Sequence, residues 1–247
     1  SYTWMDRNLG ATTASPAITT TMGLLYQWGR KDPFPGATSY TGISDGSYSS
    51  ITIYDVNGTV LTEERGISGT GVKHKPSVAT ASDKILNLKN SIKNPMTFYY
   101  GVSGSNIGND WYTVSNTSDR RYQNDALWRG GGNANPTEKT IFDPCPPGWK
   151  VPTWNGASPW RVFTTSSFTW TEDYGRIYRG KIFYPADGTR QGDSGALYHI
   201  GSYGIYWSAS ISSTPMYSYC LYFYSGNVLT SGYSNRADGI SVRCVKE

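Results

Sequence analysis

The amino-acid sequence predicts a β or α+β fold that is rich in short strands and irregular loops. Aromatic residues make up 15% of the 247 residues and glycine occurs 28 times, whereas only 16% of the residues are charged, well below the quarter that is usual in globular proteins. The chain is long enough for one large domain or two small ones with a sizeable core. This composition argues against disorder and against a coiled coil.

The N-terminal part of the chain predicts a strand followed by a short helix. Residues 2–9 have the character of a first strand. Residues 19–30 place apolar side chains at the spacing of a helix that packs with one face. These side chains are Met22, Leu25, Tyr26 and Trp28. The sequence Lys31-Asp32-Pro33 would end this helix before a turn.

Residues 36–140 shift in composition to Ser, Thr, Gly and Asn, and we expect a long, loop-rich insertion in a single domain that spans residues 1–247. Within it, Asn57-Gly58 is a strong signal for a β-hairpin turn. Residues 83–93 (DKILNLKNSIK) predict a short helix.

The C-terminal part predicts a second helix and then strands joined by tight turns. Thr153 can cap a helix over residues 154–163, although Pro159 should shorten it or shift its start. The expected strands are Phe168–Trp170, Arg176–Tyr184, Gly204–Ser210, Tyr217–Tyr224 and Ile240–Val245.

Residues 194–235 are the most distinctive segment, because 42 consecutive residues include no Asp, Glu, Lys or Arg. Residues 201–235 contain seven Tyr and nine Ser. Tyrosine offers a rigid contact area with a polar tip, and Ser, Gly and Asn supply adaptable hydrogen bonds, as in antibody paratopes. We interpret the segment as a recognition surface on a β-scaffold. The alternative is a tyrosine-rich sheet that packs on itself.

Residues 217–224 alternate between two faces of a strand. One face carries Tyr217, Tyr219, Leu221 and Phe223, and the other carries Ser218, Cys220, Tyr222 and Tyr224. We expect the face with Leu221 and Phe223 to pack on the core. The face with Tyr222 and Tyr224 would then project into solvent.

The charge and the cysteine content limit the classes of partner that the chain can have. The net charge of +4 comes from scattered basic residues, which argues against nucleic-acid binding. The sequence has no run of 18 apolar residues, so no membrane span is predicted. It also has no CxxC motif and no Cys/His cluster, so a zinc site is not expected. Cys145, Cys220 and Cys244 are either three buried thiols or one Cys145–Cys244 disulfide with Cys220 left over. The chain begins without a signal peptide, so we expect a mature or excised piece of an exported protein.

Five sequence blocks at the two ends of the chain carry a family resemblance. They are residues 4–11 (WMDRNLGA), 25–34 (LYQWGRKDPF), 145–153 (CPPGWKVPT), 206–210 (YWSAS) and 241–246 (SVRCVK). Together they resemble the C-terminal domain of Bacteroides-type fimbrillin-family surface proteins and the Fibrobacter succinogenes major paralogous domain. The insertion is unmatched.

The resemblance implies a C-type-lectin-like fold, with paired terminal strands, two short helices and a twisted antiparallel sheet that presents irregular loops. Such a fold would bring Cys145 near Cys244 and bury Trp207. It also implies an extracellular location on the bacterial cell surface, with pilin subunits as partners.

A subset of proteins with this fold carries C-terminal segments diversified by retroelements. By that resemblance, the candidate ligand-binding residues are Ser212, Tyr217, Tyr219, Tyr222, Tyr224, Asn227, Leu229, Tyr233, Asn235 and Asp238. Cys220 would be a surface-facing position that tolerates many residues.

Few residues point to catalysis. His74 and His199 lie far apart in the sequence, and we expect His199 to be a hydrogen-bonded structural residue. The sequence 192–195 (GDSG) matches the nucleophile loop of trypsin-like proteases but lacks the accompanying histidine motif. Adjacent acids such as Glu172-Asp173 are expected to be solvated rather than a hydrolytic pair. The motifs of calcium-dependent lectins are missing, so any sugar binding would be calcium-independent.

We therefore expect a non-enzymatic adhesion domain without a cofactor, such as a pilus-tip adhesin, that recognises a protein or glycan on another cell. Tyr222, Tyr224 and Tyr233 would be its anchors. The alternatives are a phage or prophage receptor-binding protein with the same surface, and a carbohydrate-active enzyme with an acidic cleft.

Overall fold

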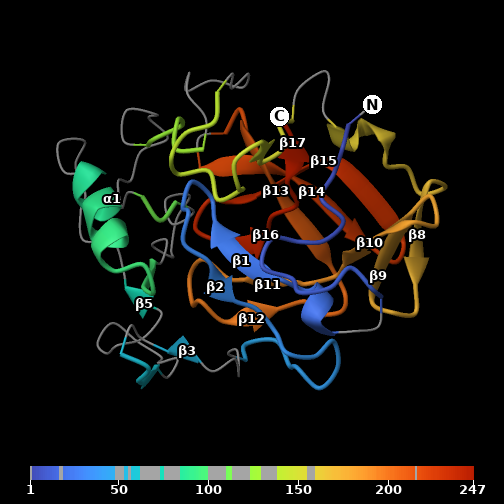
Figure 1. The fold of residues 1–247 in the computed structure, drawn as a ribbon, viewed down its shortest axis with the longest axis horizontal. Coiled ribbons are helices and arrows are strands. Elements are labelled where there is room, and N and C mark those ends of the chain that lie inside the picture. Colours follow the sequence, from blue (N-terminus) through green and yellow to red (C-terminus); the bar gives the residue numbers. More distant parts are fainter. Residues whose placement is uncertain are drawn as a thin grey trace.

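The structure, a computed structural model, is built around an eight-stranded sheet (Figure 1). It describes residues 2–16, 19–47, 53–54, 57–61, 73–74, 84–99, 110–112, 123–128, 138–154, 159–214 and 216–247. The strands of this sheet are β1 (Leu24–Gln27), β2 (Phe34–Pro35), β11 (Thr189–Arg190), β12 (Leu197–Tyr198), β13 (Gly204–Ile211), β14 (Tyr217–Tyr224), β15 (Asn227–Asn235) and β16 (Gly239–Ser241). Their order is β12-β11-β16-β13-β14-β15, and β1 pairs with β16 and β2. Only the contact between β13 and β16 is parallel among these described pairs.

The remaining strands form smaller sheets. These are the meander of β8 (Phe168–Thr171), β9 (Gly175–Tyr178) and β10 (Ile182–Pro185), and the pairs β7 (Trp149–Lys150) with β17 (Val245–Lys246), β3 (Ile53–Tyr54) with β4 (Val60–Leu61), and β5 (Lys73–His74) with β6 (Phe98–Tyr99). Figure 1 places β8–β10 at one end of the molecule and the helix α1 (Lys84–Lys93) at the other.

The two ends of the chain run side by side. Trp4 forms an isolated bridge with Val245, and the Met5 N–H donates to the Cys244 carbonyl at 3.0 Å. Cys244 is joined to Cys145 by a disulfide, which realises one of the two alternatives left open by the sequence. The strand expected over residues 2–9 is reduced to that single bridge in the described residues.

The helix expected over residues 19–30 is wrong. A 3-10 turn, η1 (Thr19–Thr21), is followed by Gly23 at a φ of 79°, in the left-handed region that interrupts regular structure. The chain then enters β1, which pairs along its two edges with β16 and β2. Its two faces are also covered, because Leu25 and Tyr26 are buried in different clusters. A strand buried on both faces gives a continuous apolar run, which periodicity does not distinguish from a buried helix.

Other expected elements are shortened or divided. In place of a helix over residues 154–163 the described residues contain the 3-10 turn η4 (Pro159–Val162), and residues 155–158 lie outside them. The expected strand 176–184 is the β9–β10 hairpin, which turns at Arg179 and Gly180, both with positive φ. The expected strand 240–245 is divided between β16 and β17, and β15 has no counterpart in the sequence prediction.

Two local predictions inside residues 36–140 are confirmed. The helix expected over residues 83–93 is α1, although Asp83 lies outside the described residues. Asn57-Gly58 connects β3 and β4, in which Tyr54 faces Val60. For the part of the chain that the structure describes, the fold is a sheet-rich α+β arrangement with α1 as its one α-helix.

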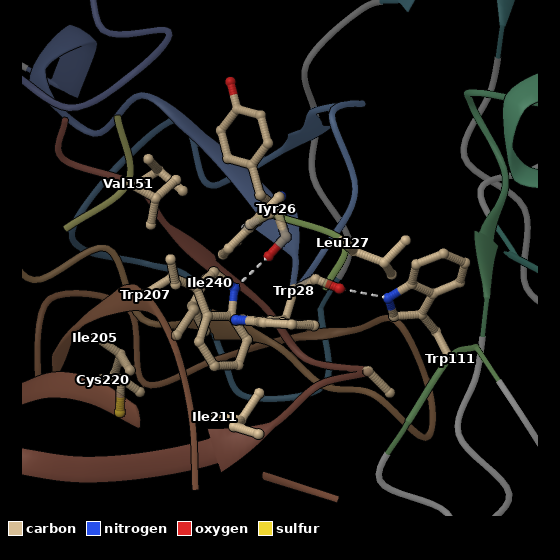
Figure 2. Packing of buried hydrophobic residues seen from close by; sticks show 14 of the residues in the cluster. Tyr26, Trp28, Trp111, Leu127, Val151, Ile205, Trp207, Ile211, Cys220 and Ile240 are labelled. Atoms are coloured by element: carbon tan, nitrogen blue, oxygen red, sulfur yellow. Dashed lines mark hydrogen bonds between the residues drawn. The ribbon is translucent and has the colours of Figure 1, made fainter. Parts of the chain in front are cut away.

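The main hydrophobic core lies on one side of β13 and β14. Trp207 is fully buried there, as the resemblance implied, and its Nε1 donates to the Tyr26 carbonyl at 2.7 Å (Figure 2). A second cluster lies on the other side of these strands and includes Tyr206, Leu221 and Phe223. The central strands are therefore covered on both faces.

The expected insertion contributes to the main core. Trp111, Leu127 and Trp128 are buried in it, and the Trp111 Nε1 donates to the Trp28 carbonyl at 2.7 Å (Figure 2). The described parts of residues 36–140 thus pack with the rest of the chain. None of the helices in the described ranges has the length and apolar character needed to cross a bilayer.

Candidate functional site

The β14–β15 hairpin presents its tyrosines on two opposite faces. Tyr219 lies opposite Tyr233 and Tyr222 lies opposite Leu229, and the pairing shifts by one residue between these two points. Ser218 and Cys220 are buried on one face of β14, and Leu221 and Phe223 are buried on the other. Each face is therefore covered along half of the strand and open along the other half.

The structure corrects the expected position of Cys220. Its side chain is fully buried in the main core, where it lies opposite Trp207 of β13, and burial raises the pKa of its thiol. Leu221 and Phe223 are buried as expected, but the opposite face of the strand is not free along its whole length. Cys220 is consequently a packing residue and not a surface position.

The first open stretch is a cluster of tyrosines at the hairpin end of β14. The ring of Tyr203 lies 5.3 Å from that of Tyr222 and 5.7 Å from that of Tyr224. His199 packs edge-on against Tyr203 at 4.7 Å. Tyr222 is half-buried against the main core, and burial, with a smaller contribution from Tyr203, raises the pKa of its hydroxyl. These rings hold one another in place.

This cluster forms one wall of an open cleft of about 820 Å³, which we call the aromatic cleft. Its four aromatic rings are Trp170 of β8, Tyr174 of the β8–β9 turn, Tyr203 and Tyr224. The volume lies within the roughly 300–1,000 Å³ range of small-molecule sites. The cleft is therefore large enough to hold a ligand rather than only water.

The acidic and basic side chains that line the aromatic cleft are the carboxylates of Asp45 and Glu172 and the imidazole of His199, and hydroxyls come from Thr171, Ser202 and Ser225. The His199 backbone N–H donates to the Asp45 Oδ1 at 2.7 Å, and its Nδ1 lies 3.7 Å from the Asp45 Oδ2. No Lys or Arg is present among the described residues that line the cleft. Its formal charge is therefore negative.

Two non-glycine residues of the aromatic cleft have left-handed backbones. Tyr174 has a φ of 59° and His199 a φ of 63°. Histidine is tolerated in this region, whereas a bulky residue such as tyrosine is a genuine outlier there. His199, expected as a structural residue, does hold Asp45 through its backbone, but 41% of its side chain is exposed.

No family model, curated protein or solved structure matches this chain. Its function is therefore inferred from the geometry of its surfaces.

The second open stretch of the hairpin lies on the opposite face. Tyr219 stacks on Trp154 with ring centres 3.8 Å apart, and Tyr217 packs against Tyr233 at 5.1 Å. Asn235 lies opposite Tyr217. Tyr233 is 62% exposed. Four of the candidate residues are therefore gathered here, away from the aromatic cleft.

The remaining candidates differ in accessibility. Leu229 is exposed, and the Asn227 Oδ1 accepts a bond from the Val228 N–H at 2.8 Å. Ser212 is buried. Asp238 is also buried and accepts bonds from the Gly192 N–H and the Ser234 hydroxyl, both at 2.8 Å. Ser212 and Asp238 are thus part of the fold and not accessible to a ligand.

Several residues of the two surfaces were not among the sequence candidates: Asp45, Trp154, Trp170, Glu172, Tyr174, His199 and Tyr203. Tyr203 and His199 belong to the uncharged segment and could have been included on that ground. The others lie far from β14 in the sequence, so nothing in the local sequence relates them to that strand.

Proposed function

We propose that this chain is a non-enzymatic ligand-binding domain of an extracellular bacterial surface protein, which recognises a protein or glycan on another cell. The observation that carries the proposal is the β14–β15 hairpin. Tyrosines are accessible on both of its faces, while the other side chains of β14 are buried. Tyrosine is enriched at binding hot spots because its ring gives a large contact area.

The proposal is supported by the way these rings are held. Tyr222 is packed on the main core and on Tyr203, and Tyr219 is stacked on Trp154. A side chain that is already ordered loses little conformational freedom when a ligand binds. Both surfaces are therefore suited to recognition by a rigid scaffold.

The features at the chain ends support a place in the fimbrillin-type group. The pairing of the two chain ends at Trp4 and Val245 and the closeness of Cys145 to Cys244 are features that the sequence resemblance implies. On this basis we propose a C-type-lectin-like adhesin that is displayed with pilin subunits, and whose C-terminal segment is a site of retroelement diversification.

The test is to remove tyrosines from each surface separately and measure binding to host-cell and glycan panels. The double variant Tyr222→Ala with Tyr224→Ala removes the rings from one surface, and Tyr233→Ala removes a ring from the other. A matched control is Tyr54→Ala, because Tyr54 is 60% exposed but lies in the β3–β4 hairpin. We expect at least one surface variant to lose about tenfold or more in affinity. Unchanged binding by both folded variants contradicts the proposal, as does turnover of a polysaccharide.

A further inference from the structure

We propose that the aromatic cleft binds an uncharged glycan. This inference rests on the proposed ligand-binding function and names the ligand class for one of the two tyrosine surfaces. It follows from three features of the cleft, which are its rings, its charge and the backbone of Tyr174.

The rings of the cleft come from three separate parts of the chain. Trp170 is on β8 and Tyr174 is in the turn that follows it, while Tyr203 directly precedes β13 and Tyr224 ends β14. Sugar rings expose patches of C–H groups that pack on aromatic faces, and binding sites combine such faces with a few well-placed polar groups. The cleft is open, so a glycan can lie in it and continue into solvent.

The charge of the cleft selects against acidic ligands. The carboxylates of Asp45 and Glu172 accept hydrogen bonds, and such bonds from sugar hydroxyls are charge-assisted. No cationic Lys or Arg side chain lines the described part of the cleft. A sialylated, sulfated or uronic-acid glycan would bring like charges together, which disfavours binding. The lining therefore favours an uncharged glycan.

Tyr174 has a strained backbone conformation. The β8–β9 connection has three residues between Thr171 and Gly175, and the last position of such loops is usually a left-handed glycine. Tyr174 occupies this position at a φ of 59°. Its ring stacks on Tyr40 at 5.6 Å and remains 39% exposed on the cleft wall. Strained residues of this kind gather at ligand-binding sites.

The strained backbone of Tyr174 allows the effect of a substitution on binding to be separated from its effect on stability. Tyr174→Gly removes the ring and relieves the backbone, so binding and stability are expected to change in opposite directions. Glu172→Gln removes one charge at an exposed position and keeps the shape of the side chain. Tyr233→Ala is the control, because it removes an exposed ring from the other tyrosine surface.

The whole chain would be screened on an array of neutral and acidic glycans that also carries a lysine-rich peptide, and the strongest neutral glycan would then be titrated by calorimetry. We expect Tyr174→Gly to weaken its binding at least tenfold without lowering the melting temperature, and Glu172→Gln to weaken it severalfold. Tyr233→Ala should leave it unchanged.

Three results would overturn the inference. These are the absence of binding to every neutral glycan, a preference for acidic glycans or for the peptide, and unchanged affinity in both cleft variants. The proposed function has a separate failure. If Tyr233→Ala is the only variant that abolishes binding to the cell panel, the domain binds a ligand but does so outside the cleft. If none of the tyrosine variants changes binding to the panel, the ligand-binding proposal itself fails.

Discussion

The Nη2 of Arg236 lies 2.7 Å from the Oδ1 of Asp125, and the two side chains are 1% and 10% exposed. A second carboxylate, that of Asp110, lies 3.8 Å from the Nη1, and the guanidinium carbon is 4.6 Å from the ring centre of Trp28. Arg236 directly follows β15, and both acids belong to the expected insertion. The first charge after the uncharged segment therefore fixes the insertion against the end of the tyrosine hairpin.

Replacing this cation should strongly destabilise the protein. Arg236→Met removes the cation that lies between two buried carboxylates, and removing one member of a buried ion pair typically costs about 3–5 kcal/mol. Urea unfolding monitored by tryptophan fluorescence measures the loss. Arg7→Met is the control, because Arg7 pairs with Asp6 at the surface and such pairs contribute little. Equal stability of the two variants would contradict the role of Arg236.

Asp238 should make stability depend on pH. Burial raises the pKa of this carboxyl to about 6, although its hydrogen bonds from Ser234 and Gly192 act in the opposite direction. Between its unfolded pKa, about 3.9, and 6 the folded state binds the extra proton, so this contribution to stability grows as pH falls and is lost as pH rises through 6. Asp238→Asn removes this contribution.

The measurement is the difference in unfolding free energy between the wild type and Asp238→Asn from pH 4 to pH 8. We expect the wild type to gain on the variant as pH falls below about 6, by at most about 1.4 kcal/mol per pH unit, and the difference to be flat above pH 7. A difference that grows with rising pH would show that the carboxylate is stabilised rather than penalised by its site.

Removal of the disulfide should cost stability because it closes a long loop. Cys145 and Cys244 are 99 positions apart, and loss of such a bond typically costs about 2–5 kcal/mol. We expect a lower melting temperature for Cys145→Ser with Cys244→Ser, and for the wild type in reductant. Cys220 is fully buried, so a thiol-alkylating reagent should label the oxidised protein only after unfolding. Labelling of the folded protein would contradict this packing.

Gly204 should tolerate no larger side chain. A Cβ at this position would clash with the ring of Phe223, which is buried in the second cluster. Overpacking of this kind typically costs about 1–3 kcal/mol. Gly36→Ala is the matched control, since its Cβ would meet Leu25 at an ordinary 3.6 Å. Thermal unfolding should separate the two variants, and a Gly204→Ala protein as stable as Gly36→Ala would show that Phe223 can move away.

Local sequence signals predicted the elements that depend on local structure. The α1 helix, the turn at Asn57-Gly58 and the bounds of β14 follow from periodicity and turn chemistry. β1 was mistaken for a helix because both of its faces are buried, with Tyr26 in the main core and Leu25 in a separate cluster. Tertiary pairing, which a single sequence does not reveal, decided that segment.

The candidate site was only partly accessible to sequence reasoning. The uncharged, tyrosine-rich composition identified β14 and β15, because the residue types of a segment by themselves indicate the chemistry of the surface that it can form. The aromatic cleft could not be foreseen, since Asp45, Trp170 and Tyr224 are brought together from distant parts of the chain. The local sequence around Tyr174 also does not predict that this tyrosine has a left-handed backbone.

The alternate burial of β14 has a practical consequence for protein engineering. Four of its eight positions point into packed clusters, namely Ser218, Cys220, Leu221 and Phe223. The other four, at positions 217, 219, 222 and 224, are tyrosines with at least one open side. A combinatorial library that randomises only these four codons would vary two separate binding faces while leaving the four fully buried positions of the strand unchanged.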